Sequence, residues 1–190
     1  MKKLVICCIM MIFAGSAFAE NAYQDKVKFG VRYDDSSDSI KNQLNVRFDL
    51  DREWNNGFKL GYGSRTNHRF EGNKNNQRHM IRLGQEFGNF QLNGQVGIKL
   101  PHGKDHSHFW TVQPGYKFKL SNSWQARVSY DYREGFKGKD DDYRYGPRLR
   151  LKKKFAKGSV IDAAEFHFDY LTFKDQETRN RISIAIEKKI

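Results

Sequence analysis

The sequence predicts an all-β protein, an antiparallel up-and-down transmembrane β-barrel of about ten strands. Apolar and polar residues alternate through nearly all of the chain after residue 20, which is the periodicity of strands. Short and long connections follow one another between the alternating segments. The mean hydropathy is low, at −0.82, yet 14% of the residues are aromatic and only 3 are Pro. Strands with one face in lipid and one in water combine these properties.

The first 19 residues are predicted to be a secretory signal peptide. Lys2 and Lys3 supply its positive start, and the apolar run 4–13 is too short to cross a bilayer of roughly 30 Å as a helix. Ala17 and Ala19 then match the small-x-small pattern that signal peptidase cuts. We therefore expect export from the cytoplasm.

Residues 20–190 are expected to form a single domain in a bacterial outer membrane, surrounded by lipid and lipopolysaccharide. Cys7 and Cys8 leave with the leader, so disulfides and Cys-based metal sites are not expected, and no cofactor is expected either. The net charge of +12 alone would suit a nucleic-acid partner. The leader and the dispersal of the bases along strands argue against that partner.

Ten segments carry the alternation. In 43–54, for example, Leu44, Val46, Phe48 and Leu50 interleave with polar residues. The predicted strands are 25–34, 43–54, 57–67, 77–88, 89–100, 107–120, 123–134, 142–155, 158–172 and 179–189. No segment of similar length shows helical spacing.

The connections fall into two kinds. Tight turns rich in Gly, Asn and Ser are predicted at 55–56, 88–89, 120–123 and 156–158. Longer polar loops are predicted at 34–41, 68–76, 101–106, 134–141 and 173–178. In outer-membrane barrels the short turns are periplasmic and the long loops face outward. An even number of strands then places both termini in the periplasm.

A water-soluble barrel or sandwich is the alternative fold, with its apolar face turned inward. Aromatic residues near strand ends argue against it, because they resemble the girdles at membrane interfaces. These aromatic residues include Trp110, Tyr116, Phe118, Trp124, Tyr130, Tyr132, Tyr143 and Tyr145. Small residues on the polar face also suit a narrow lumen filled by long Arg and Lys side chains. They are Gly61, Gly63, Gly84, Gly97, Gly115 and Gly146.

The polar face carries more bases than acids. Its bases are Lys28, Arg32, Arg47, Lys59, Arg65, Arg82, Lys99, Lys117, Lys119, Arg127, Arg133, Arg144, Arg148, Arg150, Lys152 and Arg181. Its acids are Asp49, Asp51, Glu86, Asp131, Glu165, Asp169 and Glu187. Such a lumen would concentrate anions and repel small cations. The alternative is a plugged structural or adhesive barrel, whose bases neutralise the acids while side chains fill the interior.

The turn near residue 122 places Lys117 opposite Arg127, and a symmetric loop near 138 places Arg127 opposite Arg150. A tight turn at 156–158 would place Arg150 opposite Glu165, which would hold it. We expect these bases to form the centre of an anion track, since the guanidinium fork matches carboxylates. The further pore-lining residues expected are Arg148, Arg133, Arg144, Arg47 and Arg82.

Three smaller clusters suggest other chemistry. His167 and Asp169 share a strand face and could pair as a base and its orienting carboxylate in a barrel enzyme, but no Ser stands in a recognisable nucleophile setting. His102, His106 and His108 with Asp105 could bind a metal, although a solvated loop explains them as well. Residues 140–142 are three Asp that could bind a divalent cation at a loop tip.

Several stretches resemble the oligogalacturonate-specific porin family, which includes the sialic-acid porins. They are Val112-Gln113-Pro114-Gly115-Tyr116, Asn122-Ser123-Trp124, Arg127-Val128-Ser129-Tyr130-Asp131-Tyr132-Arg133, and Asn56-Gly57-Phe58 after Trp54. The resemblance implies a monomeric outer-membrane channel whose facing basic tracks pass acidic oligosaccharides. It also implies twelve strands, whereas ten are counted here. The sequence also ends in Ile190, where an aromatic residue is usual for barrel assembly.

Overall fold

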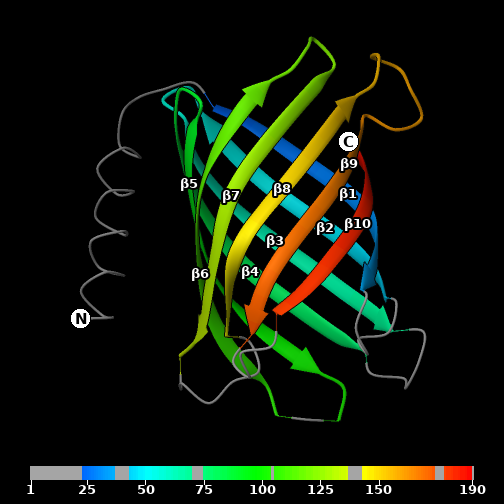
Figure 1. Ribbon diagram of the computed structural model, residues 1–190. Coiled ribbons are helices and arrows are strands. Elements are labelled where there is room, and N and C mark those ends of the chain that lie inside the picture. Colours follow the sequence, from blue (N-terminus) through cyan, green and yellow to red (C-terminus); the bar gives the residue numbers. More distant parts are fainter. Residues whose placement is uncertain are drawn as a thin grey trace.

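The computed structural model describes residues 23–36, 43–69, 75–103, 105–136, 143–173 and 178–189. The predicted signal peptide and the Asp triplet at 140–142 lie outside these residues. The strands are β1 (Tyr23–Ser36), β2 (Gln43–Trp54), β3 (Phe58–Arg69), β4 (Asn76–Phe87), β5 (Phe90–Pro101), β6 (Ser107–Lys119), β7 (Trp124–Gly135), β8 (Arg144–Lys154), β9 (Ala163–Phe173) and β10 (Thr178–Lys189). Each strand pairs antiparallel with its neighbours in sequence, and β1 pairs with β10 to close the barrel (Figure 1). The predicted up-and-down barrel of ten strands is confirmed.

The connection between β8 and β9 differs from the prediction. A tight turn was expected at 156–158, but the loop runs from Phe155, whose N–H donates to Asp162 O at 3.0 Å. Val160 is 91% exposed and takes no part in the sheet, although it continues the apolar alternation of the sequence. Strand β9 therefore begins at Ala163, later than expected, and its register against β8 shifts by two residues.

The two ends of the barrel are different. In Figure 1 the connections β2–β3, β4–β5, β6–β7 and β8–β9 lie at the upper end, and the other connections lie at the lower end; the first three of the upper connections are short turns, whereas β8–β9 is a longer loop. We call these the turn end and the loop end. Backbone hydrogen bonds close the short connections. In the β2–β3 turn, for example, the N–H of Gly57 donates to Trp54 O at 3.0 Å, and Gly57 has a φ of 84°. Both ends of the described chain lie at the turn end (Figure 1). That the turns face the periplasm stays a prediction.

The outer surface of the barrel is apolar. Phe48, Val128 and Ile184 belong to a large set of exposed apolar side chains that alternate along the strands with inward polar ones. Rings of Trp110, Tyr132, Tyr143 and Tyr145 contact one another near the loop end, with centroids 5.4–5.9 Å apart. Rings of Tyr23, Trp54 and Phe58 form a second group near the turn end. This surface suits lipid between two aromatic girdles.

Charged and polar groups fill the interior, so the water-soluble alternative is wrong for this chain. The buried side chains include Asp49, Asp131, Arg133, His167 and Asp169. A soluble barrel would place apolar groups there and leave the charges in water. No described segment is a helix long enough and apolar enough to span a bilayer.

Candidate functional site

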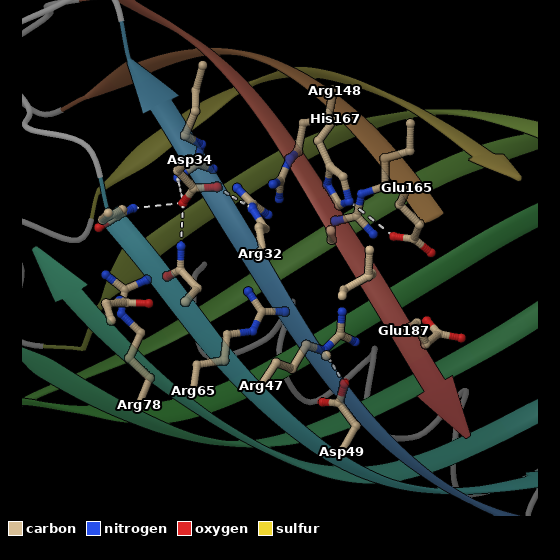
Figure 2. A pocket seen from close by; sticks show the side chains of 18 of the residues that line it. Arg32, Asp34, Arg47, Asp49, Arg65, Arg78, Arg148, Glu165, His167 and Glu187 are labelled. Atoms are coloured by element: carbon tan, nitrogen blue, oxygen red, sulfur yellow. Dashed lines mark hydrogen bonds and ion pairs between the residues drawn. The ribbon is translucent and has the colours of Figure 1, made fainter. Parts of the chain in front are cut away.

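A cavity of about 160 Å³ lies inside the barrel, and its lining runs from Asn76 and Arg179 near the loop end to Lys28 and Glu187 nearer the turn end. Figure 2 shows part of this lining. The cavity has room for on the order of ten water molecules. The bases that line it, among the described residues, are Lys28, Arg32, Arg47, Arg65, Arg78, Arg144, Arg148, Arg150, Arg179 and Arg181. The acids that line it are Asp34, Asp49, Glu165 and Glu187. Ten bases against four acids make the cavity strongly positive.

Asp169 on β9 is the centre of a buried ion-pair network in the wall of this cavity. Arg148 on β8 donates from Nε and Nη2 to the two carboxylate oxygens of Asp169, each at 2.8 Å. Arg181 on β10 donates to the same carboxylate at 2.5 Å. Arg148 also reaches Asp131 at 3.3 Å, and Asp131 accepts from Arg144 at 2.7 Å. These charge-assisted hydrogen bonds fix the guanidinium groups in place.

Asp34 on β1 forms a second such centre nearer the loop end. It pairs with Arg32 and accepts hydrogen bonds from Gln43 at 2.8 Å and Asn45 at 2.7 Å (Figure 2). Arg181 lies 3.8 Å from it, so this centre adjoins the one at Asp169. Asp34 was absent from the acids predicted on the polar face, because the expected loop began at that residue.

Bases also lie directly opposite one another in two rows across neighbouring strands. Lys117, Arg127 and Arg150 are successive Cα partners on β6, β7 and β8, as the sequence predicted. Arg47, Arg65, Arg78 and Lys99 form a second row on β2 to β5, and the first three lie side by side in Figure 2. The sequence reading missed Arg78. Alternation along β4 could have found it, but the inward Met80 interrupts the polar face there.

Arg65 and Arg150 differ from the other lining bases in their partners. Among the described residues, neither guanidinium lies within 4.0 Å of a carboxylate, and both buried Nε–H groups lack a hydrogen-bond acceptor. Their strands, β3 and β8, are five strands apart in both directions around the ring of ten. The two cations therefore face the same cavity from opposite walls, with donors available to an anion.

The predicted pore residues separate into two groups. Arg47, Arg144, Arg148, Arg150 and Glu165 line the cavity. The others lie outside its lining and have partners of their own. Lys117 bonds Glu86 at 2.5 Å, and Arg127 donates to Gln113 at 2.8 Å. Arg82 pairs with Asp49 at 2.5 Å and Asp51 at 2.8 Å. Arg133 donates to Thr111 at 3.0 Å and stacks on Phe109 at 4.2 Å.

The expected pairing of Arg150 with Glu165 is wrong. The longer β8–β9 loop places Arg150 opposite His167 and Lys152 opposite Glu165. Glu165 accordingly bonds Lys152 at 3.0 Å and contacts His167 Nε2 at 3.1 Å. Arg150 is thus left without the carboxylate that the sequence assigned to it.

The structure also does not pair His167 with Asp169, as the enzyme alternative requires. His167 contacts Glu165, whereas both oxygens of Asp169 accept from arginines. Ser183 is the Cα partner of His167 on β10, but its Oγ makes no hydrogen bond with the imidazole. A nucleophile activated by a base needs that bond. The described residues around His167 therefore form a lumen wall and not a nucleophile, base and carboxylate.

The described histidines of the β5–β6 connection do not gather around a metal site. The rings of His106 and His108 meet edge to face at 5.3 Å. Across the described part of the chain, no group of three His, Cys, Asp or Glu side chains is placed to hold a metal ion. His102 is exposed.

Comparisons with known proteins find similarity only among solved structures. No protein-family profile and no curated protein matches the sequence. A KdgM porin matches with a TM-score of 0.49 and 11% identity over 84% of this chain and 98% of that chain. A KdgM porin in complex with disordered oligogalacturonate matches at 0.48 and 9%, over 86% and 99% of the two chains. These are porins of the family that the sequence resembles.

A third match is a chain from a study of the in-meso crystallization of membrane proteins. Its TM-score is 0.46 and its identity 9%, over 87% of this chain and 84% of that chain.

Proposed function

We propose that this protein is an outer-membrane channel that passes small anionic solutes, in particular acidic oligosaccharides, through a lumen lined with Arg and Lys. The observation that carries the proposal is the pair Arg65 and Arg150. Among the described residues no carboxylate lies within 4.0 Å of either guanidinium, and the two cations face one cavity from opposite walls. Low-dielectric walls focus the field of an excess of fixed positive charge, which concentrates anions and repels small cations.

The nature of the lining bases favours carboxylates as the groups that pass. Nine of the ten bases of the cavity are Arg, whose planar fork binds a carboxylate with two parallel hydrogen bonds. Arg47, Arg65 and Arg78 are Cα partners on three neighbouring strands, and all three line the cavity. Neighbouring strands are roughly 4.8 Å apart, so a solute with several carboxylates meets a new base at each step around the wall.

A plugged structural barrel is the second candidate, and one observation favours it. Phe109 on β6 is fully buried on the lumen side, where Met80 and Arg133 pack near it. Side chains commonly fill the interior of small barrels. The cavity of about 160 Å³ is what remains of the lumen beside that packing.

Passage of matched sugars through the protein in lipid vesicles tests the proposal. We expect wild-type protein to admit a linear tri-uronate faster than a neutral trisaccharide of the same length. Replacing both Arg65→Gln and Arg150→Gln should lower that preference roughly tenfold, the factor that about 1.4 kcal/mol of lost attraction produces.

Arg52→Gln is the matched control for this pair of substitutions. Arg52 lies exposed on the outer face and pairs with Asp25 at 2.7 Å, so it should leave the preference unchanged. Wild-type protein that admits neither sugar would support the plugged barrel. Equal rates for both sugars would refute anion preference.

A further inference from the structure

The charged residues of the lumen differ in kind between its two ends. Toward the loop end the cavity is lined by Arg and Asp, whereas most of the inward charges near the turn end are Lys and Glu. We call the latter set the turn-end ring: Lys26, Glu53, Lys59, Glu86, Lys117, Lys152, Glu165 and Glu187. Each lies within four residues of the turn end of its strand.

A continuous chain of ion pairs joins five members of the ring across β1, β2, β3, β4 and β6. Lys26 pairs with Glu53, and Glu53 pairs with Lys59. Lys59 in turn bonds Glu86 at 2.5 Å, and Glu86 bonds Lys117 at 2.5 Å. Each of these glutamates is thus held by two lysines, and Lys59 is shared between both.

On the remaining side of the barrel, Lys152 forms the ion pairs of the ring. It bonds Glu165 at 3.0 Å and Glu187 at 3.1 Å, from β8 to β9 and β10. Four lysines and four glutamates leave the ring without net charge. Lys119, still nearer the mouth, is exposed.

The cavity, most of whose lining lies between the ring and the loop end, has a different balance of charge. Its ten bases exceed its four acids even though Glu165 and Glu187 belong to both sets. Asp169 accepts from two arginines and lies 3.8 Å from a third, Arg32, so one acid is shared among several cations. Fixed charge therefore falls from strongly positive to near neutral along the axis, between the loop end and the turn end.

We propose that this asymmetry makes the lumen rectify: it conducts more when the voltage drives anions from the loop end toward the turn end. The inference rests on the proposed conduction of anions. In the positive half anions carry nearly all the current, because cations are excluded there. In the neutral ring both ions carry current.

The boundary between the halves gives the current its direction. A voltage that drives anions into the ring also drives cations toward the boundary, where the positive half stops them. Both ions accumulate there and the conductance rises. The opposite voltage removes both ions from the boundary and the conductance falls. Salt screening weakens the effect, because the Debye length falls from about 10 Å at 0.1 M to about 3 Å at 1 M.

Current–voltage curves of the full protein in planar bilayers test the inference. The current ratio compares the currents at equal voltages of opposite sign. In about 0.1 M KCl on both sides we expect this ratio to be roughly two in favour of the voltage that drives anions toward the turn end, and in about 1 M KCl we expect it to be near one. An Asn55→Cys variant reports orientation, since Asn55 is exposed in the β2–β3 turn and a bulky thiol reagent reaches it only from the turn-end compartment.

A charge change in the ring tests its part in the effect. Glu53→Gln together with Glu86→Gln makes the ring positive, so the current ratio at low salt should fall toward one while anion selectivity stays. Asp25→Asn, on the exposed outer pair with Arg52, should leave the ratio unchanged. If the double variant does not fold, the salt series on wild-type protein still decides.

The outcomes separate this inference from the proposed function. An anion-selective wild-type channel with symmetric current at low salt would overturn rectification and leave the proposed function standing. A ratio that persists in about 1 M KCl, or in the double Gln variant, would also overturn it. Absence of conductance or a preference for cations would overturn both.

Discussion

Replacing Asp169 by Asn should lower the free energy of unfolding by about 3–5 kcal/mol, because it leaves the buried Arg148 and the partly buried Arg181 without the carboxylate that they share. Asp169 is 3% exposed and accepts from Arg148 at 2.8 Å and Arg181 at 2.5 Å. Asn keeps the size of the side chain but removes the charge that offsets both cations. Urea titration of protein folded into lipid vesicles measures the change.

Asp25→Asn provides the comparison for that substitution. Asp25 also binds an arginine with two hydrogen bonds, from Arg52 at 2.7 and 2.8 Å, but both partners are exposed. Exposed ion pairs contribute little to stability, so this variant should unfold like wild-type protein. Similar behaviour of the two variants would show that the network at Asp169 does not hold the lumen wall.

Replacing Phe109 by Ala should both destabilise the barrel and widen its lumen. Phe109 is 0% exposed, and its ring lies 4.2 Å from the guanidinium of Arg133. Truncation of a buried Phe costs about 3–5 kcal/mol, here with loss of the cation–π contact as well. Because the side chain points into the lumen, single-channel conductance should rise.

Phe118→Ala is the matched control on the same strand. Phe118 is exposed on the outer face, so its loss should leave conductance unchanged. A Phe109→Ala channel with wild-type conductance would mean that the narrowest part of the lumen lies elsewhere.

The fold was predictable because its signal is local. A period of two over about ten residues specifies a half-buried strand, and tight turns specify which strands pair. Lys117 therefore lay opposite Arg127, as the turn near residue 122 predicts. The β8–β9 pairing failed because Val160 continues the alternation of the sequence, although it projects from a loop.

The partners of the lumen charges depend on contacts that no single strand contains. Arg148 and Arg181 come from the two strands that flank Asp169, and β10 is placed by its pairing with β1 at the far end of the sequence. The lumen has fewer carboxylates than bases, so the three-dimensional arrangement decides which bases are paired with a carboxylate. Alternation identifies Arg65 and Arg150 as inward residues, but it does not show that, among the described residues, neither meets a carboxylate and both Nε–H groups lack an acceptor.

The zero-current potential of wild-type channels in a roughly tenfold KCl gradient tests the central proposal, an anion-selective lumen, most directly. The excess of bases around the cavity predicts a zero-current potential close to the equilibrium potential of chloride. At higher mean salt the zero-current potential should be smaller, because screening weakens the fixed charge. A potential of the opposite sign would contradict the proposed anion selectivity. Folded protein that never conducts would contradict the channel itself and favour the plugged barrel.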